Sequence, residues 1–182
     1  PALVEEIVEE LRQHPRAVAA FAERPRRGAV DVAALSALPE GTLGRAFADF
    51  LRAAKLDPND LPELPADDDG SYTIAHLYET HDLWHVVTGF SSEVSGELGL
   101  LAFYMAQFPG RLSPMLLSAG LMNTASRAMD DRADRMDAIA RGWTLGKQAD
   151  RLFGLRWAEL WERPLVEVQA SLGLVDGVSR AA

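Results

Sequence analysis

The chain has 182 residues, 48% of them hydrophobic and 25% charged, a composition typical of one soluble globular domain with a full hydrophobic core. Its formal net charge of −9 argues against nucleic acid as a partner, because nucleic-acid-binding proteins present basic surfaces. The absence of cysteine excludes disulfides and thiolate metal sites, so a bound metal would need histidine and carboxylate ligands.

The first half of the chain is predicted to be helical up to a long loop. Apolar residues at helical spacing predict helices over 3–13 and 16–23, followed by a turn rich in proline and arginine. Asp31 is a candidate N-cap for a short helix to residue 38, and Pro39 opens a longer helix over 39–55. Residues 57–70 hold three prolines and five aspartates, which predicts a loop inside one domain.

The second half is predicted to be helical as well. Ser71 is the expected cap of a helix to about residue 88, a break follows at 89–92, and the next helix ends near residue 108. Further helices are expected over 113–127, with Ser113 as N-cap, over 130–144 continuing towards 155, over 155–161 and over 164–172. No segment has the alternation of a strand. We therefore expect a single all-α domain over 1–182, an irregular helical bundle.

Three of the four histidines, His76, His81 and His85, lie within ten residues of one another. At about 100° per residue, His85 projects about 40° from His81, so both lie on one largely apolar helix face. Asp82 lies on the flank, about 100° from His81. His76 falls on the opposite side of the helix and is interpreted as an ordinary structural histidine.

Glu97 is the one carboxylate within an apolar stripe of the next helix. The residues that share its side, within about 40°, are Leu101, Tyr104 and Phe108. A carboxylate buried without a partner costs several kcal/mol or shifts its pKa, so Glu97 is expected to need a cation. The break at 89–92 folds the two helices into an antiparallel hairpin, which brings Glu97 towards His81, whereas Glu93 lies nearer the break and solvent.

Two interpretations of these residues remain open. In the first, His81, His85 and Glu97, with Asp82 as a further candidate ligand, hold one zinc, iron, manganese or cobalt ion. In the second, the histidines are amphipathic helix residues and Glu97 is solvated or salt-bridged. Two other patterns have less support: the His-x-x-x-His spacing is close to that of zinc proteases but lacks their glutamate, and an HD-type phosphohydrolase would need His14 together with Asp130, Asp131 or Asp134.

The motif His81-Asp82-x-x-His85-x11-Glu97 resembles that of the coenzyme Q (ubiquinone) biosynthesis protein family that is fourth in the customary numbering. The segments 38–51, 96–103 and 161–174 are also similar to the family, and the resemblance covers about residues 30–175. The chain lacks the long N-terminal extension of mitochondrial members. We therefore expect a bacterial homologue in the cytoplasm, at or near the inner face of the membrane.

The resemblance implies an all-α fold and one divalent metal at His81, Asp82, His85 and Glu97, with zinc, iron, manganese and magnesium not distinguished. It implies ubiquinone biosynthesis, by loss of the ring carboxylate at C1 of a polyprenylated hydroxybenzoate-type ring and hydroxylation there. His81, Asp82 and Glu97 are then the catalytic candidates, with Asp82 either a ligand or a proton carrier. Because the family is also regarded as an organiser of other biosynthetic enzymes, the alternative is a non-catalytic lipid-binding scaffold.

The resemblance also implies a pocket for a polyprenyl chain, for which core packing is the alternative use of the same side chains. The candidate lining residues are Leu77, Trp84, Leu101, Tyr104, Phe108, Met115 and Met122. The expected partner is a polyprenylated aromatic quinone precursor, with other quinone-biosynthesis enzymes and a homodimer left open. Since the net charge disfavours electrostatic attachment to anionic lipid, membrane contact is expected to be weak, hydrophobic and peripheral.

Overall fold

The structure, a computed structural model, describes residues 2–108 and 110–175. Within these ranges the only β-pairing is an isolated bridge between Thr42 and Pro164, so the predicted all-α class is confirmed. The first five helices are α1 (Ala2–Leu11), α2 (Pro15–Glu23), α3 (Val32–Ser36), α4 (Leu43–Ala54) and α5 (Asp69–Thr88). The others are α6 (Val94–Gln107), α7 (Leu112–Arg127), η1 (Met129–Asp131), α8 (Arg132–Gln148), η2 (Trp157–Leu160) and α9 (Leu165–Ser171).

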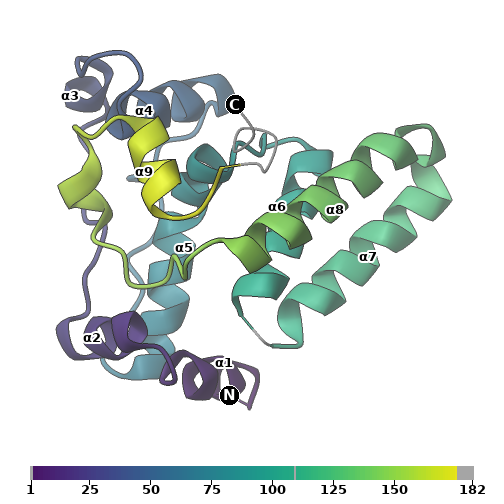
Figure 1. The fold of residues 1–182 in the computed structure, drawn as a ribbon, viewed down its shortest axis with the longest axis horizontal. Helices are drawn as coiled ribbons and strands as arrows, with labels where there is room; N and C mark the ends of the chain where they lie inside the picture. The colour runs from purple at the N-terminus through teal and green to yellow at the C-terminus, as the bar shows by residue number, and fades with distance from the viewer. Residues whose placement is uncertain (1, 109, 176–182) are drawn as a thin grey trace.

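Helix α5 occupies the centre of the molecule. It contacts α1, α4, α6 and α9, and Figure 1 shows α3, α4 and α9 on one side of it and α6, α7 and α8 on the other. Its side chains Tyr72, Leu83 and Trp84 are fully buried, and Trp84 stacks on Tyr104 of α6 with ring centroids 4.5 Å apart. Because α5 is buried on several sides, its apolar residues surround the helix and do not form a single stripe.

Glycines bring α6 and α8 into close contact. A Cβ atom added at Gly142 would lie 1.9 Å from the carbonyl oxygen of Gly99, and one at Gly146 would lie 2.8 Å from that of Phe103. No larger residue fits at these positions unless the helices move apart. The two backbones therefore touch, which fixes the position of α6 beside α8.

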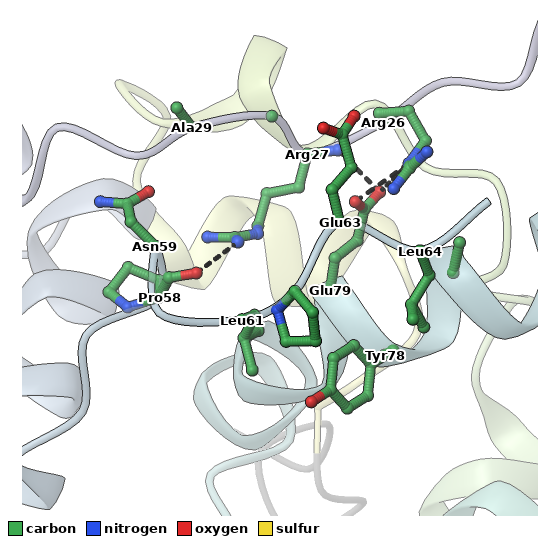
Figure 2. A pocket seen from close by; sticks show the side chains of 13 residues that line it. Arg26, Arg27, Ala29, Pro58, Asn59, Leu61, Glu63, Leu64, Tyr78 and Glu79 are labelled. Carbon is green, nitrogen blue, oxygen red and sulfur yellow. Dashed lines mark hydrogen bonds and ion pairs between the residues drawn. The ribbon is translucent and has the colours of Figure 1, made fainter. Parts of the chain in front are cut away.

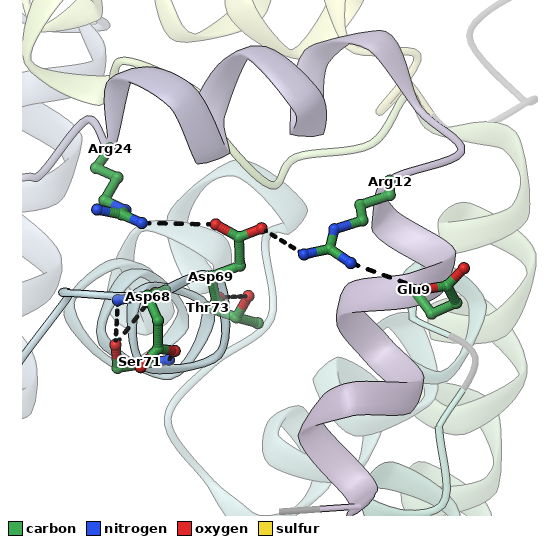
Figure 3. A network of polar contacts seen from close by, with 7 residues as sticks. All are labelled: Glu9, Arg12, Arg24, Asp68, Asp69, Ser71 and Thr73. Carbon is green, nitrogen blue, oxygen red and sulfur yellow. Dashed lines mark hydrogen bonds and ion pairs between the residues drawn. The ribbon is translucent and has the colours of Figure 1, made fainter.

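The start of α5 is held by a network of polar contacts (Figure 3). Asp68 accepts a hydrogen bond from the Ser71 amide at 2.8 Å, and the Ser71 hydroxyl accepts one from the Asp68 amide at 3.0 Å. The next residue, Asp69, pairs with Arg12 at 2.9 Å and with Arg24 at 3.6 Å. The helix thus begins at Asp69, and the prediction that Ser71 is its N-cap is wrong, because Asp68 takes that position in a capping box with Ser71 at N3.

The loop over 57–70 packs against α5 beside a cleft of about 320 Å³ (Figure 2). Arg27 donates to the carbonyl oxygen of Pro58 at 2.9 Å, while Glu79 of α5 accepts from the Arg26 guanidinium and from the Arg27 amide. Through Arg26 and Arg27, these contacts tie the predicted loop to the face of α5 that carries Glu79, away from His81. None of the predicted site residues lines this cleft.

Three other predicted boundaries are wrong. Helix α4 begins at Leu43 with Thr42 as its cap, because Gly41 takes a left-handed turn with φ of +83° after Pro39. Helix α7 begins at Leu112, so Ser113 lies inside it and is not its cap. Helix α8 ends at Gln148, since the chain becomes extended at Ala149 and the Asp150 amide donates to the carbonyl oxygen of Leu172.

Candidate metal centre

Two helices that meet at a tight turn bring His81, His85 and Glu97 together. Gly89 ends α5 in the left-handed conformation, with φ of +71°, and α6 then runs back along α5. Nε2 of His85 lies 3.1 Å from one Glu97 carboxylate oxygen, and Nε2 of His81 lies 3.7 Å from the other. The two Nε2 atoms are 3.3 Å apart. The helical hairpin expected from the sequence is therefore present, with Glu97 nearer to His85 than to His81.

His85 is held in one orientation by its surroundings. Its side chain is 1% exposed, it stacks on Phe50 with ring centroids 5.4 Å apart, and its Nδ1 lies 3.1 Å from the carbonyl oxygen of Phe90. A carbonyl oxygen only accepts hydrogen bonds, so Nδ1 carries the proton and donates. Nε2 is thereby turned towards Glu97, the orientation in which it would bind a metal while Nδ1 keeps its supporting hydrogen bond.

His81 has a similar but looser support from Tyr104. Nδ1 of His81 lies 3.4 Å from the Tyr104 hydroxyl, the two rings stack with centroids 6.1 Å apart, and the His81 side chain is 40% exposed. Burial, together with the negative charges of Glu97 and Asp82, raises the pKa of the Tyr104 phenol above its ordinary value. The phenol therefore keeps its proton, and His81 can face Glu97 through Nε2.

Glu97 is less buried than the sequence predicts. Its side chain is 42% exposed, so the prediction that an apolar stripe encloses the carboxylate overestimated its burial. The reason is that Val94, about one turn before Glu97 at the other end of this stripe, is itself half-exposed at the start of α6. Partial burial would raise the pKa of Glu97, but hydrogen bonds from His81 and His85 outweigh it and lower the pKa to about 2. The carboxylate is thus ionised at neutral pH.

These three residues fit a divalent metal. One donor atom from each lies within 4.8 Å of the other two, and no other group of three histidine or carboxylate residues in the described ranges meets this condition. Nitrogen ligands about 2.0–2.1 Å from a tetrahedral ion lie about 3.3 Å from each other, and this is the separation of the two Nε2 atoms. Two imidazoles and one carboxylate suit zinc or iron and leave coordination positions open.

Asp82 is not part of this cluster. It is partly buried on the flank of α5, as the helix geometry predicts, and its charge acts on Tyr104 and on Arg27. Its role as a ligand or a proton carrier stays a prediction. The arrangement that an HD-type hydrolase would need, with His14 near Asp130, Asp131 or Asp134, is likewise absent from the carboxylate and histidine groups of the described residues.

His76 has a structural role, as the sequence predicts. It is 1% exposed, and its Nε2 accepts a hydrogen bond from the Gly154 amide at 3.1 Å. Burial lowers the pKa of His76 from 6.5 to about 4, so the neutral ring is the stable form in the fold. Its ring packs against the rings of Tyr72 and Phe153, which belong to the core and not to the metal centre.

An apolar pocket of about 410 Å³ begins at His81 and leads away from the metal centre. Of the residues expected to line a prenyl pocket, four do so: Leu77, Leu101, Tyr104 and Phe108. Trp84 does not, because it is fully buried behind Tyr104, and Met115 and Met122 do not, because they lie on the outer surface, 62% and 69% exposed. This volume lies within the range of small-molecule sites.

The sequence reasoning missed the far wall of the pocket. That wall comes from α1 and from the start of α7, through Val4, Ile7, Leu112 and Leu116. The apolar spacing of α1 predicts a helix with one packed face, but not that this face meets α5 and α7. The partner of a packed face depends on the tertiary fold, which helical spacing does not define.

The fold and the site together define an all-α protein with a candidate metal centre of two histidines and one glutamate, next to an apolar pocket. The family described as "Coenzyme Q (ubiquinone) biosynthesis protein Coq4" matches residues 1–177, and the chain belongs to this family. The match extends further towards the N-terminus than the resemblance over about 30–175 that the sequence alone indicates.

Individual relatives agree with this assignment. The chain is 32% identical over 145 residues to the mitochondrial ubiquinone biosynthesis protein coq4 of Aspergillus niger, covering 77% of this chain and 48% of that protein. It is 28% identical over 171 residues to the rat mitochondrial COQ4 homolog, covering 91% of this chain and 63% of that protein. The chain thus spans about half to two thirds of the length of these curated relatives.

A solved structure has the same fold. A crystal structure of a protein from Nostoc punctiforme PCC 73102, described as a candidate ubiquinone biosynthesis protein, superposes with a TM-score of 0.85 at 35% identity. The match covers 96% of this chain and 82% of that one. The helical architecture is therefore that of the family.

The predicted location in a bacterial cytoplasm is wrong. The curated relatives from Aspergillus niger, rat and mouse are named as mitochondrial proteins. The position at which this chain begins gives no information about its location, because the chain covers only part of those proteins. In residues 2–108 and 110–175, no helix has the length and apolar character needed to cross a membrane.

Proposed function

We propose that this protein acts in ubiquinone biosynthesis as a metal-dependent enzyme on a polyprenylated hydroxybenzoate-type ring. The observation that carries the proposal is that His81 belongs both to the ligand cluster and to the wall of the apolar pocket. A substrate with an apolar chain and a polar ring would place the chain in the pocket and the ring beside Glu97. Family membership supports the pathway, and the geometry supports this orientation.

The side chains of the pocket would bind and position the substrate. Leu77, Leu101 and Phe108 offer apolar contact to a prenyl chain and exclude water from it, which stabilises binding by about 25 cal/mol for each Å² of apolar surface buried. Tyr104 lines the pocket beside His81 and keeps its phenolic proton. It can therefore donate a hydrogen bond to a ring oxygen at the end of the pocket.

His81, His85 and Glu97 would hold one divalent metal. When bound, such an ion supplies a positive charge that stabilises the carboxylate and the developing phenolate of the ring. In the proposed reaction the bond between ring carbon C1 and the carboxylate breaks, carbon dioxide leaves and a hydroxyl group takes its place. This change removes two electrons from the substrate, and dioxygen is the proposed oxidant: the ring carboxylic acid, water and dioxygen give the phenol, carbon dioxide and hydrogen peroxide. Asp82 on the flank of α5 is the proposed proton carrier.

The test is conversion of a prenylated hydroxybenzoate by the purified, metal-loaded protein under air, followed by mass spectrometry of the ring product. We expect Glu97→Ala to abolish product formation and Glu93→Ala, four residues away at the N-cap of α6, to leave it unchanged. Glu93 has no partner in the cluster, which makes it a matched control for loss of one carboxylate.

Equal activity of the two variants would contradict the assignment of Glu97. Absence of product from the wild-type protein, together with tight binding of the prenylated ring, would instead support the non-catalytic lipid-binding scaffold. The same outcome would contradict the proposed enzyme.

A further inference from the structure

Helix α7 has two apolar sides, and only one of them is packed. Of its sixteen residues only Thr124 is buried, although the helix contacts α6 and a Cβ atom at Gly120 would touch Leu98 of that helix. In Figure 1, α7 lies at the outer edge of the molecule. An ordinary surface helix in this position carries charged or polar residues on its outer side.

The outer side of α7 carries large apolar residues at helical spacing. We call these residues, which are Leu112, Met115, Leu116 and Met122, the outer stripe. Their exposed fractions are 48%, 62%, 47% and 69%. Ala119 lies between them on the same side and Ser126 follows Met122 by one turn, and neither carries a long polar side chain over the stripe. Contiguous exposed apolar surface of this kind marks a site of interaction with a protein or a membrane.

The charge around the stripe differs from that of the rest of the chain. No aspartate or glutamate occurs over residues 98–129, although the whole chain carries a net charge of −9. The only charged residues of this segment are Arg111 and Arg127, one at each end of α7. Arg111 also lies 3.1 Å from Glu6, yet its side chain stays 75% exposed. An apolar stripe with arginine at both ends, in a segment without an acidic residue of its own, complements a bilayer with anionic headgroups.

The stripe is continuous with the apolar pocket. Leu112 and Leu116 belong to both, and the pocket leads from them to His81. A ligand that enters beside α7 would therefore reach the metal centre without crossing polar surface. A protein partner on the stripe would cover this route, whereas a bilayer would supply apolar ligands to it.

We propose that α7 is the membrane-docking helix of this protein, lying flat in the interfacial region of a lipid bilayer with its outer stripe inserted. The pocket then opens to the acyl chains, which deepens the proposed function by giving a prenylated substrate its route. Only the identity of the pocket's ligand rests on that proposed function. The docking itself rests on the stripe, its charge and its continuity with the pocket.

Flotation with lipid vesicles tests this proposal, using phosphatidylcholine alone and phosphatidylcholine with phosphatidylglycerol. We expect the wild-type protein to float with both, more strongly with the anionic vesicles at low salt. The double variant Met115→Glu/Met122→Glu should bind at least about tenfold more weakly to each, since it places two charges in the stripe. The matched control is Val18→Glu/Val166→Glu, which changes two residues 49% and 68% exposed on α2 and α9 and should bind as the wild type does.

Circular dichroism and zinc titration of the same variants show whether the fold and the metal centre are intact. Loss of vesicle binding with zinc binding unchanged supports the docking helix independently of the reaction. No flotation of the wild type, or equal flotation of the stripe variant, would overturn the proposal. A dimer that the stripe variant dissociates, with no vesicle binding by the wild type, would assign the stripe to a second copy of the chain and also overturn it.

Discussion

His85 and Phe90 are joined across the turn between α5 and α6, with Nδ1 of His85 3.1 Å from the carbonyl oxygen of Phe90. This hydrogen bond links the turn that folds α6 back on α5 to the orientation of a candidate metal ligand. The turn therefore does two things at once: it brings Glu97 to the histidines and it directs Nε2 of His85 towards Glu97. Binding of a metal at this site depends on the hairpin as a whole.

Tyr104 is expected to tune the affinity of the site for metal through His81. The variant Tyr104→Phe removes the hydroxyl 3.4 Å from His81 Nδ1 and keeps the ring that stacks on Trp84. Loss of such a supporting group typically weakens metal binding by about 10-fold to 100-fold, and the longer contact here places the expected effect near about 10-fold. The measurement is zinc affinity by calorimetry.

Tyr78→Phe is the matched control for that experiment. Tyr78 lines the same pocket, but among the described residues its hydroxyl forms no hydrogen bond with His81, His85 or Glu97. We expect its zinc affinity to equal that of the wild type. If both tyrosine variants bind zinc equally well, Tyr104 does not support His81.

His76 is expected to make the fold sensitive to acid. Its pKa is lowered by burial, from 6.5 to about 4, so the unfolded chain takes up a proton first as the pH falls. The contribution of His76 to the free energy of unfolding is therefore fully present above about pH 6.5. It is lost as the pH falls towards about 4, by up to about 3 kcal/mol. Urea unfolding at a series of pH values measures this loss.

The variant His76→Gln should reduce that acid sensitivity. The glutamine side chain does not titrate, and its oxygen can accept the hydrogen bond that the Gly154 amide donates to His76. We expect the variant to lose less stability than the wild type between about pH 6.5 and about pH 4. An unchanged dependence on pH would mean that other groups cause the acid sensitivity.

The contact between α6 and α8 should depend on glycine at position 142. A methyl group at Gly142→Ala would lie 1.9 Å from a backbone oxygen of α6, which cannot rotate away, so the free energy of unfolding should fall by about 3 kcal/mol. At Gly120→Ala the nearest atom, 2.2 Å away, is the end of the Leu98 side chain, which can move. There the gain in helix propensity, about 1 kcal/mol, offsets much of the cost. Equal losses in the two variants would contradict backbone contact as the cause.

Local sequence patterns predicted the helices and the hairpin, because those depend on residue spacing and on breaks such as Gly89. They also placed His81 and His85 on one face of α5. The burial of Glu97 was overestimated, since the stripe around it ends at the half-exposed Val94. The N-terminal wall of the pocket could not be predicted, because Val4 and Ile7 reach it only through the packing of α1 on α5.

The prediction that Met115 and Met122 line the pocket was wrong for a similar reason: local spacing does not determine tertiary packing. Their helical spacing indicates an apolar face, but spacing does not say whether that face lies in the core or on the surface. The structure places both on the outside of α7, where they belong to the outer stripe. Helix α7 is packed through its small residues, and its large apolar residues point away from the core.

The central claim is that His81, His85 and Glu97 form a metal site, and zinc titration of the metal-free protein tests it most directly. We expect one zinc ion per chain, with affinity reduced about 100-fold or more in Glu97→Gln and unchanged in Glu93→Gln. Both substitutions remove one negative charge near the start of α6, so the comparison separates a ligand from a general effect of charge. No zinc binding by the wild type, or equal affinity in the two variants, would contradict the claim.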